Sequence, residues 1–203
     1  MTDAAPYPNF PAVEGLLDYA IVPAGPADAA ELARVHVASW RETYPGILPQ
    51  ASLDAMSLEA HERRFRRDLL RAKAGDVVLL AEGADGAAGY AAGSRLRTAD
   101  RPADAEVFTL YLLRKAQGLG LGRALLSAAA RILAAEGAGS LMLTVLSGNR
   151  HARRFYEHLG GEAFAEFPAK GWAGVTETAY RWADIESLTR PSPRPGRGIS
   201  RPG

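Results

Sequence analysis

The chain has 203 residues and a mass of 21.6 kDa, which is enough for one domain with a sizeable hydrophobic core. Its 24 lysines and arginines nearly balance 23 aspartates and glutamates, so the net charge gives no reason to expect nucleic acid as a partner. Cysteine is absent from the sequence, which excludes disulfides, thiolate metal sites and a cysteine acyl-enzyme.

The two ends of the chain differ in composition from its middle. Residues 1–17 carry three prolines and little periodicity, so we predict an N-terminal arm. The folded domain is expected over residues 18–185. Residues 186–203 become rich in Pro, Gly and Arg and predict a disordered tail, for which a nucleic-acid role is the least favoured reading. Because the sequence shows neither a secretory signal nor a membrane-length apolar run, we expect a cytoplasmic protein with no membrane partner.

Hydrophobic periodicity predicts the elements of the first half of the domain. A strand is expected over 19–24, followed by a helix that Asp28 and Glu31 open as a capping box and that runs through Tyr44. A second amphipathic helix is expected over 52–73. Five apolar side chains of this second helix should face the core: Leu53, Met56, Phe65, Leu69 and Leu70.

The second half begins with a predicted β-hairpin and then alternates strands and helices. The expected strands are 77–82, 87–97, 106–113, 141–147, 162–167 and 176–184, and the expected helices are 122–137 and 149–160. The strand-helix-strand-helix order in the middle predicts a right-handed crossover between parallel strands, with antiparallel hairpins on both sides. The fold class that follows is α+β, with a mixed sheet.

A glycine-rich loop stands between a predicted strand and the start of a predicted helix. It reads Gln-Gly-Leu-Gly-Leu-Gly-Arg over residues 117–123. A helix start offers unpaired N–H groups and partial positive charge, and glycine lets a phosphate approach the backbone, so this loop predicts an anion site. Arg123-Ala124 is not the Lys-Ser/Thr of a P-loop, and the G-x-G-x-G spacing is not that of a dinucleotide site. A plain connection without a ligand remains the alternative.

The sequence resembles the GNAT superfamily of acetyltransferases in two motifs. Residues 110–126, LYLLRKAQGLGLGRALL, resemble the first motif, with Arg114 where proline is frequent. The strand 141–147, Asn149 and the segment 152–160 resemble the second. The resemblance implies a mixed sheet of about six to seven strands with a central parallel pair, flanked by about four helices.

The resemblance also implies an activity and a set of cofactor-binding residues. A primary amine of a small molecule or peptide would attack acetyl-CoA directly in a ternary complex. The strand backbone would bind the pantetheine amides, and the N–H groups of the loop would bind the pyrophosphate. An asparagine, which could instead be a plain N-cap, would bind the pantetheine arm. The residues concerned are Leu110, Tyr111, Leu112, Gln117, Gly118, Leu119, Gly120, Leu121, Gly122, Arg123 and Asn149.

The resemblance further implies the catalytic groups. Tyr156 stands where the family often has the acid that protonates the departing thiolate, although core packing also explains it. Thr144 occupies the position where several members have a basic Glu, so the base is sought at Glu106 and next at His36. No metal is expected, since the four histidines show no ligand spacing.

The helix predicted near the N-terminus adds a hypothesis about the acceptor. Residues 32–49 resemble the opening of a bacterial subgroup that includes PaiA-type enzymes, and His36, Trp40 and Tyr44 share one helix face. Such a face suits contact with an apolar or cationic amine, and it equally suits packing in the hydrophobic core. The acceptor, the acyl chain and a homodimer stay open, and a non-catalytic acyl-CoA-binding module is the competing function.

Overall fold

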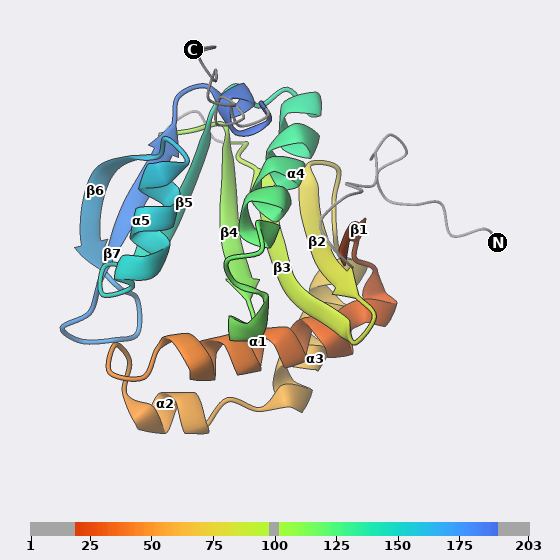
Figure 1. Cartoon of the computed structure of the whole chain (residues 1–203), viewed down its shortest axis with the longest axis vertical. Coiled ribbons are helices and arrows are strands. Elements are labelled where there is room, and N and C mark those ends of the chain that lie inside the picture. The colour runs from red at the N-terminus through yellow and green to blue at the C-terminus, as the bar shows by residue number, and fades with distance from the viewer. Residues whose placement is uncertain (1–18, 98–101, 191–203) are drawn as a thin grey trace, which may run out of the picture.

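The computed structural model describes residues 19–97 and 102–190, and their centre is a seven-stranded sheet in the order β1-β2-β3-β4-β5-β7-β6 (Figure 1). The strands are β1 (Tyr19–Pro23), β2 (Asp76–Gly83), β3 (Gly86–Arg95), β4 (Ala105–Leu112), β5 (Leu141–Leu146), β6 (Glu162–Pro168) and β7 (Thr176–Trp182). Every neighbouring pair is antiparallel except β4 and β5, which are parallel. The predicted mixed sheet with one parallel pair is therefore confirmed.

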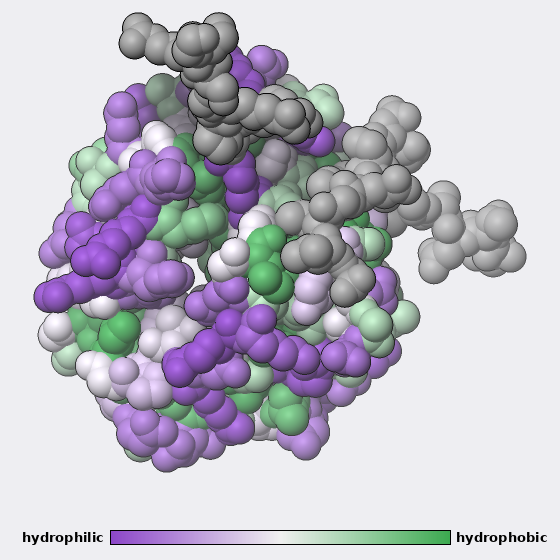
Figure 2. Space-filling model, viewed as in Figure 1, coloured by the Kyte–Doolittle hydropathy of each residue, from purple (hydrophilic) through white to green (hydrophobic). Residues whose placement is uncertain are grey.

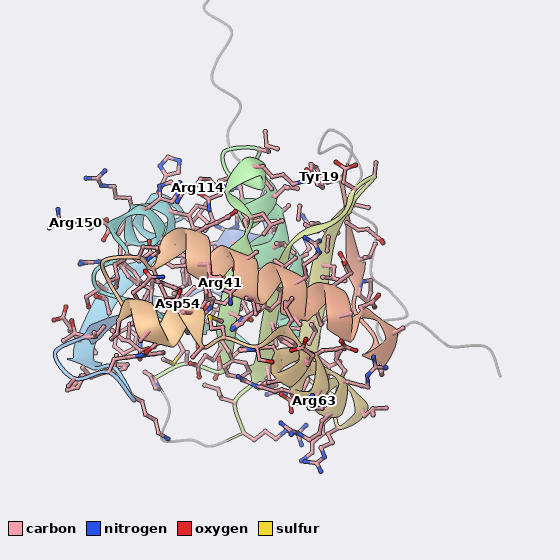
Figure 3. All side chains as sticks on the ribbon, turned by 90° about the horizontal axis from the view of Figure 1, so that it is seen from below. Tyr19, Arg41, Asp54, Arg63, Arg114 and Arg150 are labelled. Atoms are coloured by element: carbon pink, nitrogen blue, oxygen red, sulfur yellow. The ribbon has the colours of Figure 1, made fainter. Side chains whose placement is uncertain are left out.

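Five α-helices and three short 3₁₀ turns cover the sheet within the described ranges. They are α1 (Ala29–Thr43), α2 (Gln50–Asp54), α3 (Leu58–Leu70), α4 (Leu121–Ala135), α5 (Arg150–His158), η1 (Pro26–Asp28), η2 (Arg114–Ala116) and η3 (Ile185–Leu188). In Figure 1, α4 crosses in front of the strands and α5 lies beside β5 and β7, whereas α1, α2 and α3 gather below. Seen from below, α1 runs across the front with α3 beside it (Figure 3).

The helix α4 is held to the sheet by an almost completely buried apolar face. Leu125, Leu126, Ala129 and Leu133 fall at helical spacing and have no solvent exposure. They belong to a core cluster that also contains buried side chains of β2, β4 and β5. Burying a leucine side chain contributes about 1.5–3 kcal/mol. This packing fixes the position of the helix start relative to the strands.

The parallel pair β4–β5 is very short. Only Ala105 with Leu141 and Glu106 with Met142 are in register, and beyond them the two strands diverge (Figure 1). A bulge in β4 lies at the same place, because Thr109 and Val107 pair with consecutive residues of β3 and leave Phe108 out of the ladder. Past Glu106, the β4 backbone therefore has no strand partner on the β5 side.

The start of α1 differs from the predicted capping box. The Asp28 carboxylate accepts a hydrogen bond from the Gly25 N–H (2.8 Å) and closes the 3₁₀ turn η1 instead of capping α1. Glu31 accepts from the Ala87 N–H (3.0 Å) and pairs with Arg34 (2.8 Å). The Glu31 carboxylate, which the local pattern assigned to the helix start, thus makes a long-range hydrogen bond to the β2–β3 hairpin instead.

The helix predicted over 52–73 is wrong as a single element. It is divided into α2 and α3, because the Ser57 hydroxyl accepts a hydrogen bond from the N–H three residues on and starts a new helix. Leu53 is buried as predicted, but Leu70 is 69% exposed. Adjacent helical residues point about 100° apart, so only Leu69 of the leucine pair packs against the core.

The predicted C-terminal boundary at residue 186 is too early. Ile185 and Leu188 of η3 are buried in the core cluster that contains α4. Ile185 lies inside the predicted domain, whereas the composition of the following segment placed Leu188 in the predicted tail. The arm 1–17 and the rest of the tail, 191–203, lie outside the described residues. Within the described ranges, no helix has both the length and the apolar character needed to cross a membrane.

The bulge at the divergence point yields a test of stability. A Cβ on Gly93 would lie 2.5 Å from the Glu106 carbonyl oxygen and 3.1 Å from the Val107 Cα. Because backbone atoms cannot move aside cheaply, Gly93→Ala should lower the free energy of unfolding by about 1–3 kcal/mol in urea denaturation. The control Ser94→Ala on the same strand should change it by less than about 0.5 kcal/mol. Equal losses from the two variants would contradict the close approach.

Candidate active site

A cavity of about 990 Å³ opens where β4 and β5 diverge. Its walls come from β4, β5, the loop before α4, α5, the C-terminal part of α1 and the segment between β6 and β7. The face shown in Figure 2 is hollowed between the regions over α5 and α4, with hydrophilic residues along the rim. The cavity therefore joins elements that lie far apart in the sequence.

One wall of the cavity is the start of α4. Gly120 is the N-cap in the left-handed conformation (φ +83°), which favours glycine. The first helical hydrogen bond joins the Ala124 N–H to the Gly120 carbonyl (3.0 Å), so the N–H groups of residues 121–123 have no helical partner. Gly122 packs closely, since a Cβ there would lie 3.2 Å from Phe155 and 3.3 Å from Leu112. The loop presents backbone donors to the cavity and suits an anion.

Most of the predicted cofactor residues line this cavity together. Leu119 and Leu121 are the two that do not, and the Leu121 side chain is buried in the core. The predicted residues in the walls are Leu110, Tyr111, Leu112, Gln117, Gly118, Gly120, Gly122, Arg123 and Asn149. The structure thus brings the two sequence motifs to one place.

Asn149 combines two contacts. Its Oδ1 accepts a hydrogen bond from the Ala152 N–H (3.1 Å), so it is the N-cap of α5. Its side chain also lies near the hydroxyl of Tyr44, which in turn lies near that of Tyr111. Burial raises the pKa of both tyrosines, with the Asn149 contact acting in the opposite direction on Tyr44. Both phenols stay protonated and can donate hydrogen bonds at neutral pH.

Tyr156 is both a core residue and a wall residue. Its ring is 6% exposed and packs against Phe155, Tyr180 and Trp182. The hydroxyl lies on the cavity and has no hydrogen-bond partner among the described residues. Burial, and secondarily the charge of Tyr111, raise the pKa of this phenol. The core interpretation made from the sequence is therefore confirmed, whereas the catalytic role of the hydroxyl stays a prediction.

Two predicted residues lie away from the walls. Glu106 sits at the paired end of β4, beside Met142, and is not among the residues that line the cavity. His36 is 7% exposed and its Nδ1 lies 2.7 Å from the Tyr90 hydroxyl. Burial, followed by the charges of His61 and Arg64, lowers the pKa of His36 to about 3. His36 is therefore a neutral core residue, whereas Trp40 and Tyr44 on the same helix do line the cavity.

Sequence reasoning missed several residues that line the cavity, two of which lie C-terminal to both motifs. Glu177 on β7 and Trp172 in the segment before it both line the wall opposite α4 and α5. Burial raises the pKa of the Glu177 carboxyl. Neither residue belongs to a motif. The only available signal was a carboxylate inside a predicted strand, which is also typical of an exposed strand face.

Known proteins match the chain over most of its length. The profile of the Acetyltransferase (GNAT) family matches residues 35–161. YuaI, an uncharacterized N-acetyltransferase of Bacillus subtilis, is 30% identical over 164 residues, which are 79% of this chain and 91% of that protein. The family match covers β4, β5, α5 and the loop before α4, which form much of the cavity wall.

Solved structures share the fold. A GNAT-family acetyltransferase from Desulfovibrio desulfuricans is 24% identical with a TM-score of 0.64, covering 82% of this chain and 99% of its own. PaiA N-acetyltransferase from Thermoplasma acidophilum, in complex with coenzyme A, is 20% identical with a TM-score of 0.64, covering 81% and 98%. Fold and family match together define an acetyltransferase. The chain belongs to the GNAT family, as its two motifs predicted.

The raised pKa of Glu177 gives a prediction about stability and pH. A carboxyl whose pKa is raised by folding holds its proton more tightly in the folded state, so the free energy of unfolding falls as pH rises between the unfolded and folded pKa values. Glu177→Gln removes this loss. The variant should melt a few degrees higher than the wild type at pH 7, and the difference should vanish near about pH 4.

The control for this experiment is Glu162→Gln on the exposed strand β6. It should show no pH-dependent difference in melting temperature. A Glu177→Gln variant that melts below the wild type at pH 7 would contradict the assignment of Glu177 as a carboxylate that burial destabilises.

Proposed function

We propose that the protein transfers an acetyl group from acetyl-CoA to a primary amine of a small molecule or peptide, by direct attack in a ternary complex. One observation carries the proposal: the unpartnered β4 backbone, the start of α4 and the Tyr156 hydroxyl meet in a single cavity. Membership of the GNAT family supports acetyl transfer in general. The complexes of neighbouring folds with coenzyme A or acetyl-CoA support the choice of donor.

The cavity wall supplies the groups that a coenzyme A molecule needs. The β4 backbone over 110–112 would pair with the pantetheine amides as an added strand does. The free N–H groups over 118–123 would bind the pyrophosphate at the positive end of α4. Asn149 would hydrogen-bond the pantetheine arm with the part of its side chain that now contacts Tyr44.

The rim of the same wall carries positive and titratable side chains. His151, Arg154 and His158 follow one another at helical spacing on α5 and line the cavity, as does Arg123 on α4. We propose that Arg154 binds the 3′-phosphate of coenzyme A, since guanidinium pairs with phosphate in two-point hydrogen bonds.

In the proposed reaction the amine nitrogen attacks the thioester carbon and the C–S bond breaks. The departing sulphur takes up the proton that the acylated nitrogen releases, so coenzyme A leaves as its thiol. Tyr156 would donate a hydrogen bond to the sulphur as negative charge develops there. The proposed base is Glu106, which lies on the same sheet face as Thr144 and would reach the amine through a water beside that hydroxyl. Orientation of thioester and amine would supply the rest of the rate enhancement.

The role of Tyr156 is tested by removing only its hydroxyl. Tyr156→Phe should lower kcat with acetyl-CoA and a responsive amine by about 100-fold, with little change in the KM for acetyl-CoA, because the hydrogen bond forms as charge develops. Tyr180→Phe is the matched control, since the Tyr180 ring packs on Tyr156 but does not line the cavity. Unchanged turnover in Tyr156→Phe would sink the assignment. Coenzyme A binding without acetylation of any amine would favour the non-catalytic alternative.

The phosphate assignment is tested with a truncated ligand. Arg154→Gln should weaken coenzyme A binding by about 10-fold in titration calorimetry and leave dephospho-coenzyme A binding nearly unchanged, because the truncated ligand lacks the 3′-phosphate. Arg150→Gln is the control. Arg150 lies on the same helix, is exposed outside the cavity wall (Figure 3), and should affect neither ligand. An equal loss for both ligands would place Arg154 on the pyrophosphate instead.

A further inference from the structure

The cavity has two chemically different ends. Four of its five arginine and histidine side chains lie on α4 and α5, namely Arg123, His151, Arg154 and His158, and the fifth, Arg114 of η2, donates a hydrogen bond to the Glu42 carbonyl (2.6 Å). Its two carboxylates come from the opposite wall, Glu42 on α1 and Glu177 on β7. A cavity divided in this way suits an anion at one end and a cation at the other.

The pairing of the strands shows on which side of the sheet Glu177 lies. Glu177 is directly opposite Leu146 in the antiparallel pair β5–β7, so the two side chains project to the same face. Leu146 packs in a cluster with Tyr44 of α1 and Leu53 of α2. Glu177 therefore projects toward the α1–α2 side, whereas Tyr156 reaches the cavity from α5.

Four aromatic rings surround this end of the cavity. The Trp40 ring lies 5.0 Å from Tyr44, 6.1 Å from Tyr111 and 5.9 Å from Trp172, measured between centroids, and all four rings line the wall. Glu177 lines the same cavity as the four rings, and its negative charge is one of the influences that raise the pKa of Tyr111. Ring faces attract cations, and they do so more strongly where water is excluded.

The two carboxylates differ in whether they are already engaged. The Glu42 carboxylate accepts a hydrogen bond from the Arg114 N–H (2.7 Å) and so ties α1 to η2. The Glu177 carboxylate has neither a hydrogen bond nor an ion pair with any residue in 19–97 and 102–190, although it is only partly exposed. A half-buried carboxylate without a partner is costly unless a ligand brings a positive charge or a donor.

We propose that Trp40, Tyr44, Tyr111 and Trp172 form an aromatic cage that, with Glu177, binds a positively charged group of the acceptor other than the amine that is acetylated. This inference rests on the proposed function. The reacting amine lies toward Tyr156 and the sulphur, and the second cation lies toward α1 and α2. The acceptors of this site are alkyl amines with a second ammonium group, and acceptors that end in a carboxylate are repelled by Glu177.

Three acceptors with four carbon atoms each separate the effect of the terminal charge from that of the chain. Butylamine, 1,4-diaminobutane and 4-aminobutanoate present a neutral, a cationic and an anionic end behind the same primary amine. With the wild-type protein and acetyl-CoA, kcat/KM should be highest for the diamine, by about 10-fold over butylamine, and lowest for the amino acid. An equal kcat/KM for the diamine and butylamine would overturn the proposal.

The variant Glu177→Gln keeps the shape of the side chain and removes its charge. It should lower kcat/KM for the diamine by about 10- to 100-fold, mainly through KM, and change butylamine by less than about 3-fold. Glu162→Gln, on the exposed strand β6, is the matched control and should change neither value. If Glu177→Gln lowers all three substrates equally, the carboxylate acts on the reacting amine and the proposed second cation site is wrong.

A binding experiment separates this inference from the proposed reaction. In the complex of the full chain with coenzyme A, titration with 1,4-diaminobutane should quench tryptophan fluorescence, since Trp40 and Trp172 line the cage. Glu177→Gln should weaken this binding by about 10-fold. Diamine binding without turnover would refute the proposed function alone. Turnover of the diamine without saturable, Glu177-dependent binding would refute the cage alone.

Discussion

The short contact between β4 and β5 determines the rest of the structure. Two parallel strands in one sheet normally stay paired, but here only two residue pairs form before the strands diverge. The bulge at Phe108 adds twist to β4 at that point. A gap in a sheet exposes backbone hydrogen-bonding groups that must find other partners. The divergence therefore creates both the cavity and its binding chemistry, and it lets groups from the two faces of the sheet meet.

Much of the fold follows from local sequence patterns. Alternating and helical apolar spacing predicted every strand and the helices α1, α4 and α5 to within a few residues, and all of these elements except the exposed edge strand β6 bury apolar side chains. The errors arise where a distant segment decides. Glu31 reads as a helix cap but bonds Ala87, 56 residues away. Leu188 reads as the start of a tail but is buried in the core that includes α4, which only the folded chain brings near.

The cavity was only half predictable for the same physical reason. The loop over 117–123 has a local signature, because glycine conformation and the helix start make the anion site within a few residues. The opposite wall has none. Trp172 and Glu177 lie in the same cavity wall as Trp40 only because of the order of the strands. The helix face of His36 predicted that it lines the site, but side chains of α3 pack against its ring and bury it. Contacts of this kind depend on tertiary structure, which motif spacing does not encode.

The burial of Tyr156 limits what its hydroxyl can do. Its pKa is raised above the ordinary value of about 10, whereas a thiol has a pKa of about 8.5, so full proton transfer to the departing thiolate runs uphill. A hydrogen bond to the sulphur does not require the phenol to ionise. The attacking nitrogen becomes acidic once it is bonded to the acyl carbon, and it carries the proton that the reaction must release. Burial thus keeps the donor hydrogen on Tyr156 and leaves the net proton transfer to the amine and its base.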